Sequence, residues 1–414
     1  MTDTPQMTDM NDAILAEGEK DRQFIGMTLA LFLSYLAVAL PLSILSIHNP
    51  RGGGLSNFLG GLGVGASFLS TIATRKTMGD VADRLGGKVC FTRGSVMYAG
   101  AGVLCMLAAV ETLPVGARFA VLLAGRLLLG LGESMVNVSM VSWSVAMLGV
   151  ARTGRVMSAI GLAMYAAFVL GSPIGYAVYN AWGFGALMAL AALAPAAGFL
   201  LVQRAVPFRH GGSPRHASFG RIIAIIWPEG TALFLQGIGI SVIGAFLSKT
   251  FLDRGWPLAG WGMSCFGVGF VLMRILIGHL PDRIGGKPVA IGSVAVESAG
   301  LYLLWLAPGP YAALAGSLVA GAGASMIYPS LGREVVLATP EALRGAALGC
   351  YAAFQDISYF VAGPIAGFLA DRFGDQAPFL FSALSATAGL ALLLAHPEGG
   401  PSDQGPRSWS GRLK

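Results

Sequence analysis

The sequence predicts an all-α membrane protein with twelve transmembrane helices arranged as two pseudo-symmetric six-helix bundles. Apolar residues make up 55% of the 414 residues and charged residues only 12%, whereas a soluble protein carries about a quarter charged residues. The apolar residues occur in blocks of roughly 18 to 25, long enough to cross about 30 Å of hydrocarbon as helices. A charged loop pattern also occurs twice, which is typical of a chain made of two related halves.

The apolar blocks place the helices in order along the chain. No alternation of the kind found in membrane barrels is present, and the first 23 residues are polar and rich in acids, unlike a secretory signal. The fourth and tenth blocks are long enough to tilt. The twelve spans are predicted near 24–47, 57–78, 89–110, 118–147, 157–178, 184–203, 229–250, 258–278, 288–306, 311–336, 345–370 and 378–395.

Basic residues predict the orientation of these spans. Most of the 27 Lys and Arg lie in the even-numbered gaps and the two tails, and cytoplasmic loops carry such an excess. Both termini are therefore expected in the cytoplasm. The exceptions in other gaps are Arg51, Arg118, Lys249, Arg254 and Arg372.

Five segments follow from this reading. They are a cytoplasmic tail at 1–23, a six-helix bundle at 24–203, a basic linker at 204–228, a second bundle at 229–395 and a cytoplasmic tail at 396–414. The linker is rich in Pro, Gly and Arg, as expected of a flexible connection. Its last residues, 219–227, are expected to form a short helix on the membrane surface.

The repeated loop has the same internal spacing in both halves of the chain. A glycine without a side chain lets a neighbouring helix approach, and an acid there can accept hydrogen bonds from a helix N-terminus. The first copy comprises Arg75, Gly79, Asp83, Arg84, Gly86 and Lys88. The second comprises Arg274, Gly278, Asp282, Arg283, Gly285 and Lys287.

These residues resemble the cytoplasmic signature of the major facilitator superfamily, Gly-x-x-x-Asp-Arg-x-Gly-Arg-Lys/Arg. Gly87 and Gly286 depart from it, because each stands where the family usually has Arg. Arg126, Gly130 and Gly132 match the family's helix-four signature, Arg-x-x-x-Gly-x-Gly. The similarity covers essentially all twelve spans and is greatest to bacterial arabinose or multidrug efflux permeases. It implies that the repeated loops close a cytoplasmic gate.

The helix-five signature of antiporters, Gly-Pro-x-x-Gly-Gly, is met only in part. The stretch 172–176 contains Pro173 and Gly175 but lacks the closing pair of glycines. Gly363, Pro364 and Gly367 match the signature better, although they lie in the eleventh span. The resemblance therefore supports antiport less strongly than it supports the family.

Ionisable residues within the spans are the candidates for coupling transport to protons. Charges at the centre of a bilayer are costly and usually face a cavity or a partner. Asp356, Glu133 and Glu297 lie well inside predicted spans, and Arg126 lies on the same helix face as Glu133. No histidine is deep in a span, so a carboxylate is expected to carry the proton. Each acid could instead be a structural group paired with a neighbour.

The resemblance also indicates where a small-molecule substrate would bind. In this family the first, fourth, seventh and tenth helices line the central cavity. For each polar or aromatic residue there, packing is an alternative to contact with the substrate. The candidates are Tyr35, Asn137, Trp143, Gln236, Tyr328 and Gln355, the last of which is on the eleventh helix.

Several function classes are excluded. The four cysteines are isolated and lack metal-binding spacing. No nucleophile turn, Walker loop or zinc-protease motif occurs, so we expect no enzyme activity, no cofactor and no metal. The basic residues are scattered, which argues against nucleic-acid binding.

We therefore expect a monomeric, proton-coupled secondary transporter in the lipid bilayer that exports a small sugar-like or drug-like solute. An uptake symporter for a sugar, organic acid or metabolite is one alternative. A transporter-like receptor or lipid-handling protein that moves no soluble solute is another.

Overall fold

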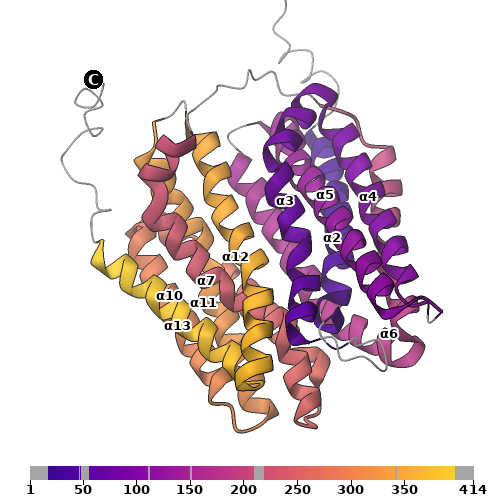
Figure 1. The fold of residues 1–414 in the computed structure, drawn as a ribbon. Helices are drawn as coiled ribbons and strands as arrows, with labels where there is room; N and C mark the ends of the chain where they lie inside the picture. The colour runs from indigo at the N-terminus through magenta and orange to yellow at the C-terminus, as the bar shows by residue number, and fades with distance from the viewer. Residues whose placement is uncertain are drawn as a thin grey trace, which may run out of the picture.

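The computed structural model describes residues 17–45, 47, 56–110, 112–149, 152–208, 219–340 and 343–396, and every regular element within them is a helix. The helices form two bundles side by side, one built from α2–α6 and the other from α7–α13 (Figure 1). This arrangement confirms the predicted fold class.

The N-terminal bundle supplies six membrane crossings from five helical elements. Gly183 has a φ of +81°, which interrupts α6 and divides it into two segments that match the predicted spans at 157–178 and 184–203. A positive φ of this size suits glycine, which has no Cβ to clash. The elements are α2 (Glu17–Leu45), α3 (Asn57–Leu85), α4 (Gly87–Leu107), α5 (Val115–Leu148) and α6 (Thr153–Gln203).

The C-terminal bundle begins earlier than the sequence predicts. α7 starts at Phe219 and continues through Pro228, so residues 219–227 are not a separate surface helix. Ile222 and Ile226 are buried one turn apart in the core of the bundle, and this packing holds the segment inside. The elements are α7 (Phe219–Asp253), α8 (Gly262–Ile277), α9 (Leu280–Ile284), α10 (Gly286–Trp305), α11 (Pro310–Ala338), α12 (Arg344–Phe373) and α13 (Ala377–Ala395).

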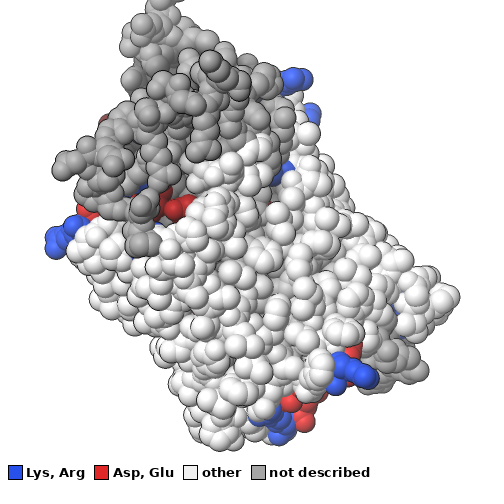
Figure 2. Space-filling view, turned by 60° about the vertical axis from the view of Figure 1, so that its left-hand side comes forward, with Lys and Arg blue, Asp and Glu red and all other residues white. Residues whose placement is uncertain are grey.

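The surface of the molecule suits a lipid environment. In the described part of the chain, nine helices are long and apolar enough to cross a membrane. Large apolar side chains such as Leu200, Ile275 and Leu394 are more than half exposed. Figure 2 shows a broad band without Lys, Arg, Asp or Glu, between charged side chains at the two ends. The molecule is therefore a multi-pass membrane protein.

The two ends of the bundles carry different connections, and we name them accordingly. The terminal face holds the start of α2, the end of α13 and the α3–α4 turn, whereas the opposite face holds the end of α2 and the start of α3. At the terminal face Gly86 and Gly285 close the two repeated loops with φ of 88° and 92°. Their N–H groups donate to Ala82 and Pro281 at 2.9 and 3.1 Å. The sequence repeat is therefore also a repeat of backbone conformation.

The first helix extends into the segment that the sequence assigns to a tail. α2 begins at Glu17, well before the apolar run that starts at Phe24. Two ion pairs hold its first turns against the start of α6, from Glu17 to Arg152 at 2.9 Å and from Asp21 to Arg155 at 2.8 Å. The acids at the start of α2 are also favourable to its helix dipole.

Candidate functional site

An ion pair joins the two bundles inside the molecule. Arg75 on α3 donates through Nη2 to the Oδ2 atom of Asp356 on α12. Asp356 is buried, with 8% of its surface exposed. The sequence placed Arg75 in the gate signature and Asp356 among the proton-coupling candidates, but it did not predict that they pair. A predicted gate residue and a predicted proton-coupling residue therefore pair with each other in the structure.

Close backbone packing of α3 on α12 brings these side chains together. A methyl group on Gly61 would meet the carbonyl of Gly363, and one on Gly65 would meet the carbonyl of Phe360. A methyl group on Gly367 would likewise meet the backbone of Asn57. Glycines at a helix interface allow backbones to approach in this way. The sequence signal was Gly363 and Gly367, which resemble the antiporter signature.

A second polar contact lies in the N-terminal bundle beside the first. The hydroxyl group of Tyr35 on α2 lies 3.3 Å from Glu133 Oε1, and it lies 2.6 Å from the amide nitrogen of Asn137. Tyr35 is 1% exposed and Glu133 is 6% exposed. The other carboxylate oxygen of Glu133 has no hydrogen-bond partner among the described residues. One oxygen of Glu133 thus accepts a hydrogen bond from Tyr35, and the other can accept a further hydrogen bond or a proton.

These two contacts form one charged group. Glu133 interacts electrostatically with Asp356 and with Arg75, which belong to α12 and α3. Tyr328 on α11 also interacts with the charges of Arg75 and Asp356. We call Tyr35, Arg75, Glu133, Asn137 and Asp356 the central polar cluster. It contains two acids and one base, drawn from both bundles.

Arg126 does not pair with Glu133, although the two residues share a helix face. Its Nε atom donates to the Gly63 carbonyl at 3.1 Å, and its Nη2 atom donates to Ser67 Oγ at 3.1 Å. These bonds attach α5 to α3 at a buried position, since Arg126 is 1% exposed. Arg126 acts on Glu133 only through its longer-range charge.

Glu297 lies inside the C-terminal bundle. It is fully buried on α10, and neither carboxylate oxygen has a hydrogen-bond partner among the described residues. Two glycines leave room for it, because a methyl group on Gly323 of α11 or Gly239 of α7 would meet Glu297 atoms. Glu297 is therefore a packed acid that lies outside the central polar cluster as we define it.

The predicted substrate contacts fall into two groups. Trp143 is fully buried at the terminal face, where its Nε1 atom donates to the Val206 carbonyl at 3.1 Å and its ring meets the edge of Phe91. Gln236 donates within its own helix to Leu233 at 3.2 Å. The other candidates, Tyr35, Asn137, Tyr328 and Gln355, lie in or next to the central polar cluster.

The gate residues of the first copy have mixed surroundings. The surroundings of Gly79 and of the Asp83 side chain lie outside what the structure describes, and Arg84 is exposed. Lys88 donates to the carbonyls of Gln203 and Ala205, both at 2.7 Å. This contact places a cation at the C-terminal end of α6, where the helix dipole favours it.

In the second copy only part of the gate signature faces outward. Gly278, Asp282 and Arg283 are exposed, whereas Lys287 is buried. Arg274 lies over the ring of Phe270, with its guanidinium carbon 5.2 Å from the ring centre.

The structure explains the two departures from the family signature. A Cβ on Gly87 would meet the Cβ of Trp143, and one on Gly286 would meet the carbonyl of Ser330. The N–H group of Gly286 donates to Glu334 Oε1 at 2.9 Å, so this acid caps α10. Gly87 thus packs against α5, and Gly286 packs against α11. Neither position leaves room for an Arg side chain.

Sequence reasoning also missed a contact of Asp371 across the bundles. Asp371 accepts hydrogen bonds from the N–H groups of Asn57 and Phe58, at 2.9 and 3.0 Å. It thereby caps the N-terminus of α3, a position that favours an anion. A signal was present, because an acid in the last turn of α12 is unfavourable to its own helix and needs an outside partner.

Comparison with known proteins agrees with the two-bundle helical fold. The model of the Major Facilitator Superfamily matches residues 24–229 and 230–412. An MFS-type transporter of Salmonella typhimurium, described as uncharacterized, is 36% identical over 364 residues, which cover 88% of this chain and 94% of that relative.

Two solved structures share the fold. The inward-open xylose transporter of E. coli has a TM-score of 0.75 at 15% identity and covers 93% of this chain and 97% of its own. A nucleoside transporter has a TM-score of 0.72 at 15% identity, with 90% of this chain and 99% of its own covered.

Proposed function

The chain belongs to the major facilitator superfamily, and from this premise we propose that it exports a small organic solute by proton-coupled alternating access. Membership makes the molecule a membrane transporter. The observation that carries the finer proposal is the ion pair between Arg75 and Asp356, because it joins α3 of one bundle to α12 of the other.

A proton on Asp356 would change how the bundles hold each other. The carboxylate binds the Arg75 guanidinium only while it is ionised, because the pair is an attraction between opposite charges. Protonation would release Arg75 and weaken one contact between α3 and α12. A ligand or proton that favours one arrangement shifts the population toward it. The pair would therefore link proton binding to the movement of the bundles.

Glu133 is the second proton site in this proposal. It shares an electrostatic field with Asp356 and Arg75, and one of its oxygens has no hydrogen-bond partner among the described residues. In this proposal the two acids gain and lose protons as a coupled pair. Glu297 is the third candidate, since it is buried without a described partner in the second bundle.

The polar groups near the cluster supply the proposed solute contacts. Tyr35, Asn137, Tyr328 and Gln355 offer hydroxyl and amide groups, which suit an uncharged sugar-like or drug-like solute. Gln355 directly precedes Asp356 on α12, so one helix would carry both a proposed solute contact and a proposed proton site. Its amide donates to the hydroxyl group of Tyr359 at 2.7 Å. Trp143 and Gln236 would act from further away, through the packing of α5 and α7.

Besides the Arg75–Asp356 pair, three further contacts between the bundles lie toward the opposite face. Ser172 donates to the Gly260 carbonyl at 2.9 Å, Ser264 donates to the Val169 carbonyl at 2.7 Å, and Asp371 caps α3. We assign this arrangement to the state in which the opposite face is closed. The exposed gate residues Asp282 and Arg283 of the terminal face would pair across the bundles in the other state.

The protein is proposed to act as a monomer in the bacterial inner membrane with both termini in the cytoplasm. The terminal face would then be the cytoplasmic one, and the closed face would be the outer one. The excess of Lys and Arg in the connections of the terminal face supports this orientation.

Everted membrane vesicles with an internal pH probe test the proposal. In everted vesicles acidified inside, an exporter moves protons out of the lumen when its solute is added, so a panel of sugars and toxic compounds is screened for alkalinisation. We expect a response in the wild type and none in Asp356→Asn. The matched control is Asp253→Asn, which removes an exposed acid that pairs with Lys249 on the same helix.

Each outcome has a definite meaning. If adding the solute acidifies the lumen, protons and solute move in the same direction. This result would replace the proposal of export by one of uptake symport. Binding of a solute without flux of the solute or of protons would favour the receptor alternative. A full response in Asp356→Asn would remove this residue from the coupling mechanism.

A further inference from the structure

Arg274 on α8 lies in the interface between the two bundles. It follows Gly267 by seven residues and Phe270 by four, so the three residues share one face of the helix. Phe270 stacks on Tyr165 of α6, with ring centres 3.3 Å apart. A methyl group on Gly267 would meet the side chain of Val169, which also belongs to α6. Arg274 therefore faces the other bundle.

The interaction of Arg274 with Tyr165 is the counterpart, in the sequence repeat, of the Arg75–Asp356 pair. Arg75 and Arg274 begin the two copies of the repeated loop. Asp356 and Tyr165 each stand eight residues before the first proline inside their own helix. In both cases a helix of one bundle meets a helix of the other. The position that holds an acid in one half of the chain thus holds a tyrosine in the other half.

The charge of Arg274 is therefore left without an acid. Apart from the ring of Phe270, its guanidinium group has no hydrogen-bond or ion-pair partner among the described residues. The titratable side chain that acts on it there is Tyr165, and Glu297 acts on Tyr165 but not on Arg274. An unpaired charge inside a protein is costly. Because the Arg274 side chain is partly exposed, an anion from solution can reach it.

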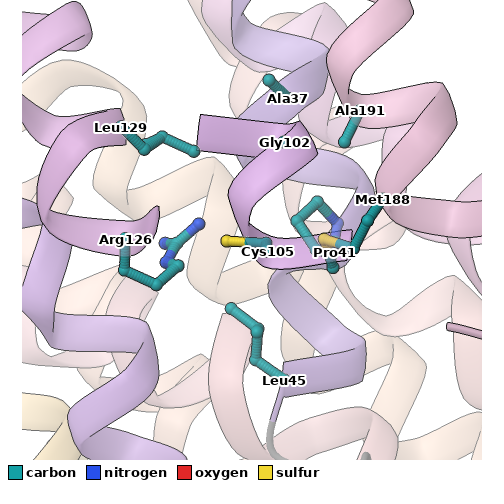
Figure 3. A pocket seen from close by; sticks show the side chains of 9 residues that line it. All are labelled: Ala37, Pro41, Leu45, Gly102, Cys105, Arg126, Leu129, Met188 and Ala191. Carbon is teal, nitrogen blue, oxygen red and sulfur yellow. The ribbon is translucent and has the colours of Figure 1, made fainter. Parts of the chain in front are cut away.

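Arg126 also lacks an acid at contact distance within the described part of the chain, but a solute cannot reach it. It is 1% exposed, and the cavity beside it has a volume of about 10 Å³, which is roughly the space of one water molecule. Figure 3 shows that the wall of this cavity consists mainly of apolar side chains, among them Leu129 and Met188. Of these two bases, Arg274 is therefore the one that can bind a solute.

The surroundings of Arg274 leave its hydrogen-bond donors free. Its guanidinium carbon lies 5.2 Å from the centre of the Phe270 ring. A guanidinium group that stacks on a ring keeps its N–H edge available for two parallel hydrogen bonds. Tyr165 beside it interacts with Tyr359 of α12, whose hydroxyl group accepts from Gln355 at 2.7 Å. A solute at Arg274 would thus also meet neutral hydroxyl and amide groups.

The charge at this position fits a monovalent anion. One guanidinium group balances one negative charge, whereas a phosphate ester carries nearly two at neutral pH. Arg75 does not supply a second positive charge, because it is already paired with Asp356. A carboxylate carries a single charge, and its two oxygens match the two parallel donors of a guanidinium group.

We propose that Arg274 binds a carboxylate group of the transported solute, which makes small organic acids, such as sugar acids and aromatic acids, the substrate class. This inference rests on the proposed transport function and narrows its solute. The hydroxyl and amide groups near the central polar cluster would contact the uncharged body of the solute, and Arg274 would contact its carboxylate. Arg274 is then the residue that distinguishes an acid from its uncharged relatives.

Replacing Tyr165 tests whether the site accepts a carboxylate. Tyr165→Asp places an acid opposite Arg274, as Asp356 lies opposite Arg75, and Tyr165→Asn is the uncharged control of the same size. In thermal unfolding of the purified full-length protein in detergent, Tyr165→Asp should have a midpoint several degrees above that of Tyr165→Asn. The difference should disappear when Arg274→Gln is added to both variants.

Thermal unfolding with added solutes tests what binds to the wild type. The probes are glucuronate, galacturonate and benzoate, each compared with its uncharged relative glucose, galactose or benzamide, at neutral pH and constant ionic strength. A ligand that binds only the folded state raises the unfolding midpoint as its concentration exceeds its dissociation constant. We expect at least one acid to raise the midpoint and its uncharged relative to leave the midpoint unchanged.

Variants of Arg274 assign the effect to this residue. Arg274→Gln should weaken binding of the acid at least about tenfold, the loss expected for a hydrogen bond to a charged group. Arg274→Lys keeps the charge without the two parallel donors and should weaken binding less. Tyr165→Asp should no longer bind the acid, because its own carboxylate occupies Arg274. Arg93→Gln, which removes an exposed base of α4, is the control and should bind as the wild type does.

Three results would overturn the proposal. Equal midpoints of Tyr165→Asp and Tyr165→Asn would mean that Arg274 does not accept a carboxylate, and the solute measurements decide if Tyr165→Asp does not fold. A wild type that responds to none of the acids, or equally to the uncharged relatives, would exclude organic acids as the substrate class. An acid effect that persists in Arg274→Gln would place the carboxylate elsewhere. These measurements need no proton gradient, so they remain decisive even if proton-coupled export fails in vesicles.

Discussion

At the scale of single residues, the charged groups inside the bundles are held by few partners. Asp356 has the guanidinium of Arg75, Glu133 has the hydroxyl of Tyr35, and Glu297 has no hydrogen-bond partner among the described residues. Structural acids in a core are usually fully hydrogen-bonded. An acid with an unpartnered oxygen, such as Glu133, is better suited to bind and release a proton. Asp356 is proposed as a coupling residue on a different ground, because its only described ion pair reaches the other bundle.

The Glu133→Gln variant separates the charge of this residue from its contact. The amide oxygen of Gln can still accept from Tyr35, so the loss of folding stability should be within about 1 kcal/mol. Proton-driven transport should be lost, because an amide does not titrate. Solute flux down a concentration gradient, measured in the same vesicles, is the control and should persist. Normal proton-driven transport by Glu133→Gln would exclude this acid from coupling.

Gly87 gives a second test at this scale. Gly87→Arg restores the residue that is usual in the family, yet it should destabilise this protein because its Cβ would meet Trp143. Overpacking a well-packed site costs about 1–3 kcal/mol. The comparison is Gly116→Arg, near the start of α5, where nothing lies within 4 Å of a Cβ. Equal thermal midpoints for the two variants would contradict the packing argument.

At the scale of elements, α3 and α12 are the pair that most directly joins the bundles. They meet backbone to backbone at Gly61 and Gly363, they share the Arg75–Asp356 pair, and Asp371 of α12 caps the start of α3. These are also the two long helices outside the set of nine apolar candidates in the described chain. Their lower hydropathy is consistent with helices that face each other and the cluster more than they face lipid.

Two glycines on α3 offer a matched pair of substitutions. Gly61→Ala introduces a methyl group against the Gly363 carbonyl, and it should cost about 1–3 kcal/mol or force α3 away from α12. Gly63→Ala meets nothing within 4 Å and should be neutral or stabilising by up to about 1 kcal/mol, as Ala favours helix. Thermal unfolding in detergent distinguishes them. A destabilised Gly63→Ala with an unchanged Gly61→Ala would show that the α3–α12 contact is not as close as described.

At the scale of the whole molecule, the fold was predictable because membrane-spanning helices can be recognised in a sequence as long, continuous apolar segments. The α6 element is an example: the sequence predicts two spans with a gap at 179–183, and the structure interrupts the helix at Gly183 within that gap. The start of α7 was predicted wrongly, since Ile222 and Ile226 look like a surface-helix pattern until their core partners are known.

The candidate site was predictable in its residues but not in its contacts. Asp356, Glu133 and Arg126 stand out because charges in apolar runs are rare. The pairing of Asp356 with Arg75 depends on how two helices from different halves pack, which a single sequence does not contain. The same reason explains why Asp371 was missed and why Arg126 bonds to α3 although it shares a helix face with Glu133. In both cases, packing between helices that are distant in the sequence determines the partners of the side chain.

Alternating access predicts that the contacts at the opposite face must open during transport. Tyr176 on α6 and Gly260 next to α8 belong to different halves, and a Cβ on Gly260 would lie 2.8 Å from the Cβ of Tyr176. Disulfide-bonded cysteines hold their Cβ atoms about 3.5–4.5 Å apart, so after the two backbones separate by about 1 Å the Tyr176→Cys/Gly260→Cys pair should form a disulfide. This disulfide should block solute flux, and reduction should restore the flux. Each single variant is a control. Full flux in the cross-linked protein would contradict the assignment of this face as a moving gate.

The most direct test of the central claim is a double-mutant cycle between Arg75 and Asp356. Proton-driven transport is measured in proteoliposomes for the wild type, Arg75→Gln, Asp356→Asn and the double variant, with thermal unfolding to confirm folding. If the two residues act as one coupling unit across the bundles, the double variant should lose no more activity than the worse single variant. Losses that multiply, as for independent sites, would contradict the claim that this ion pair links proton binding to bundle movement.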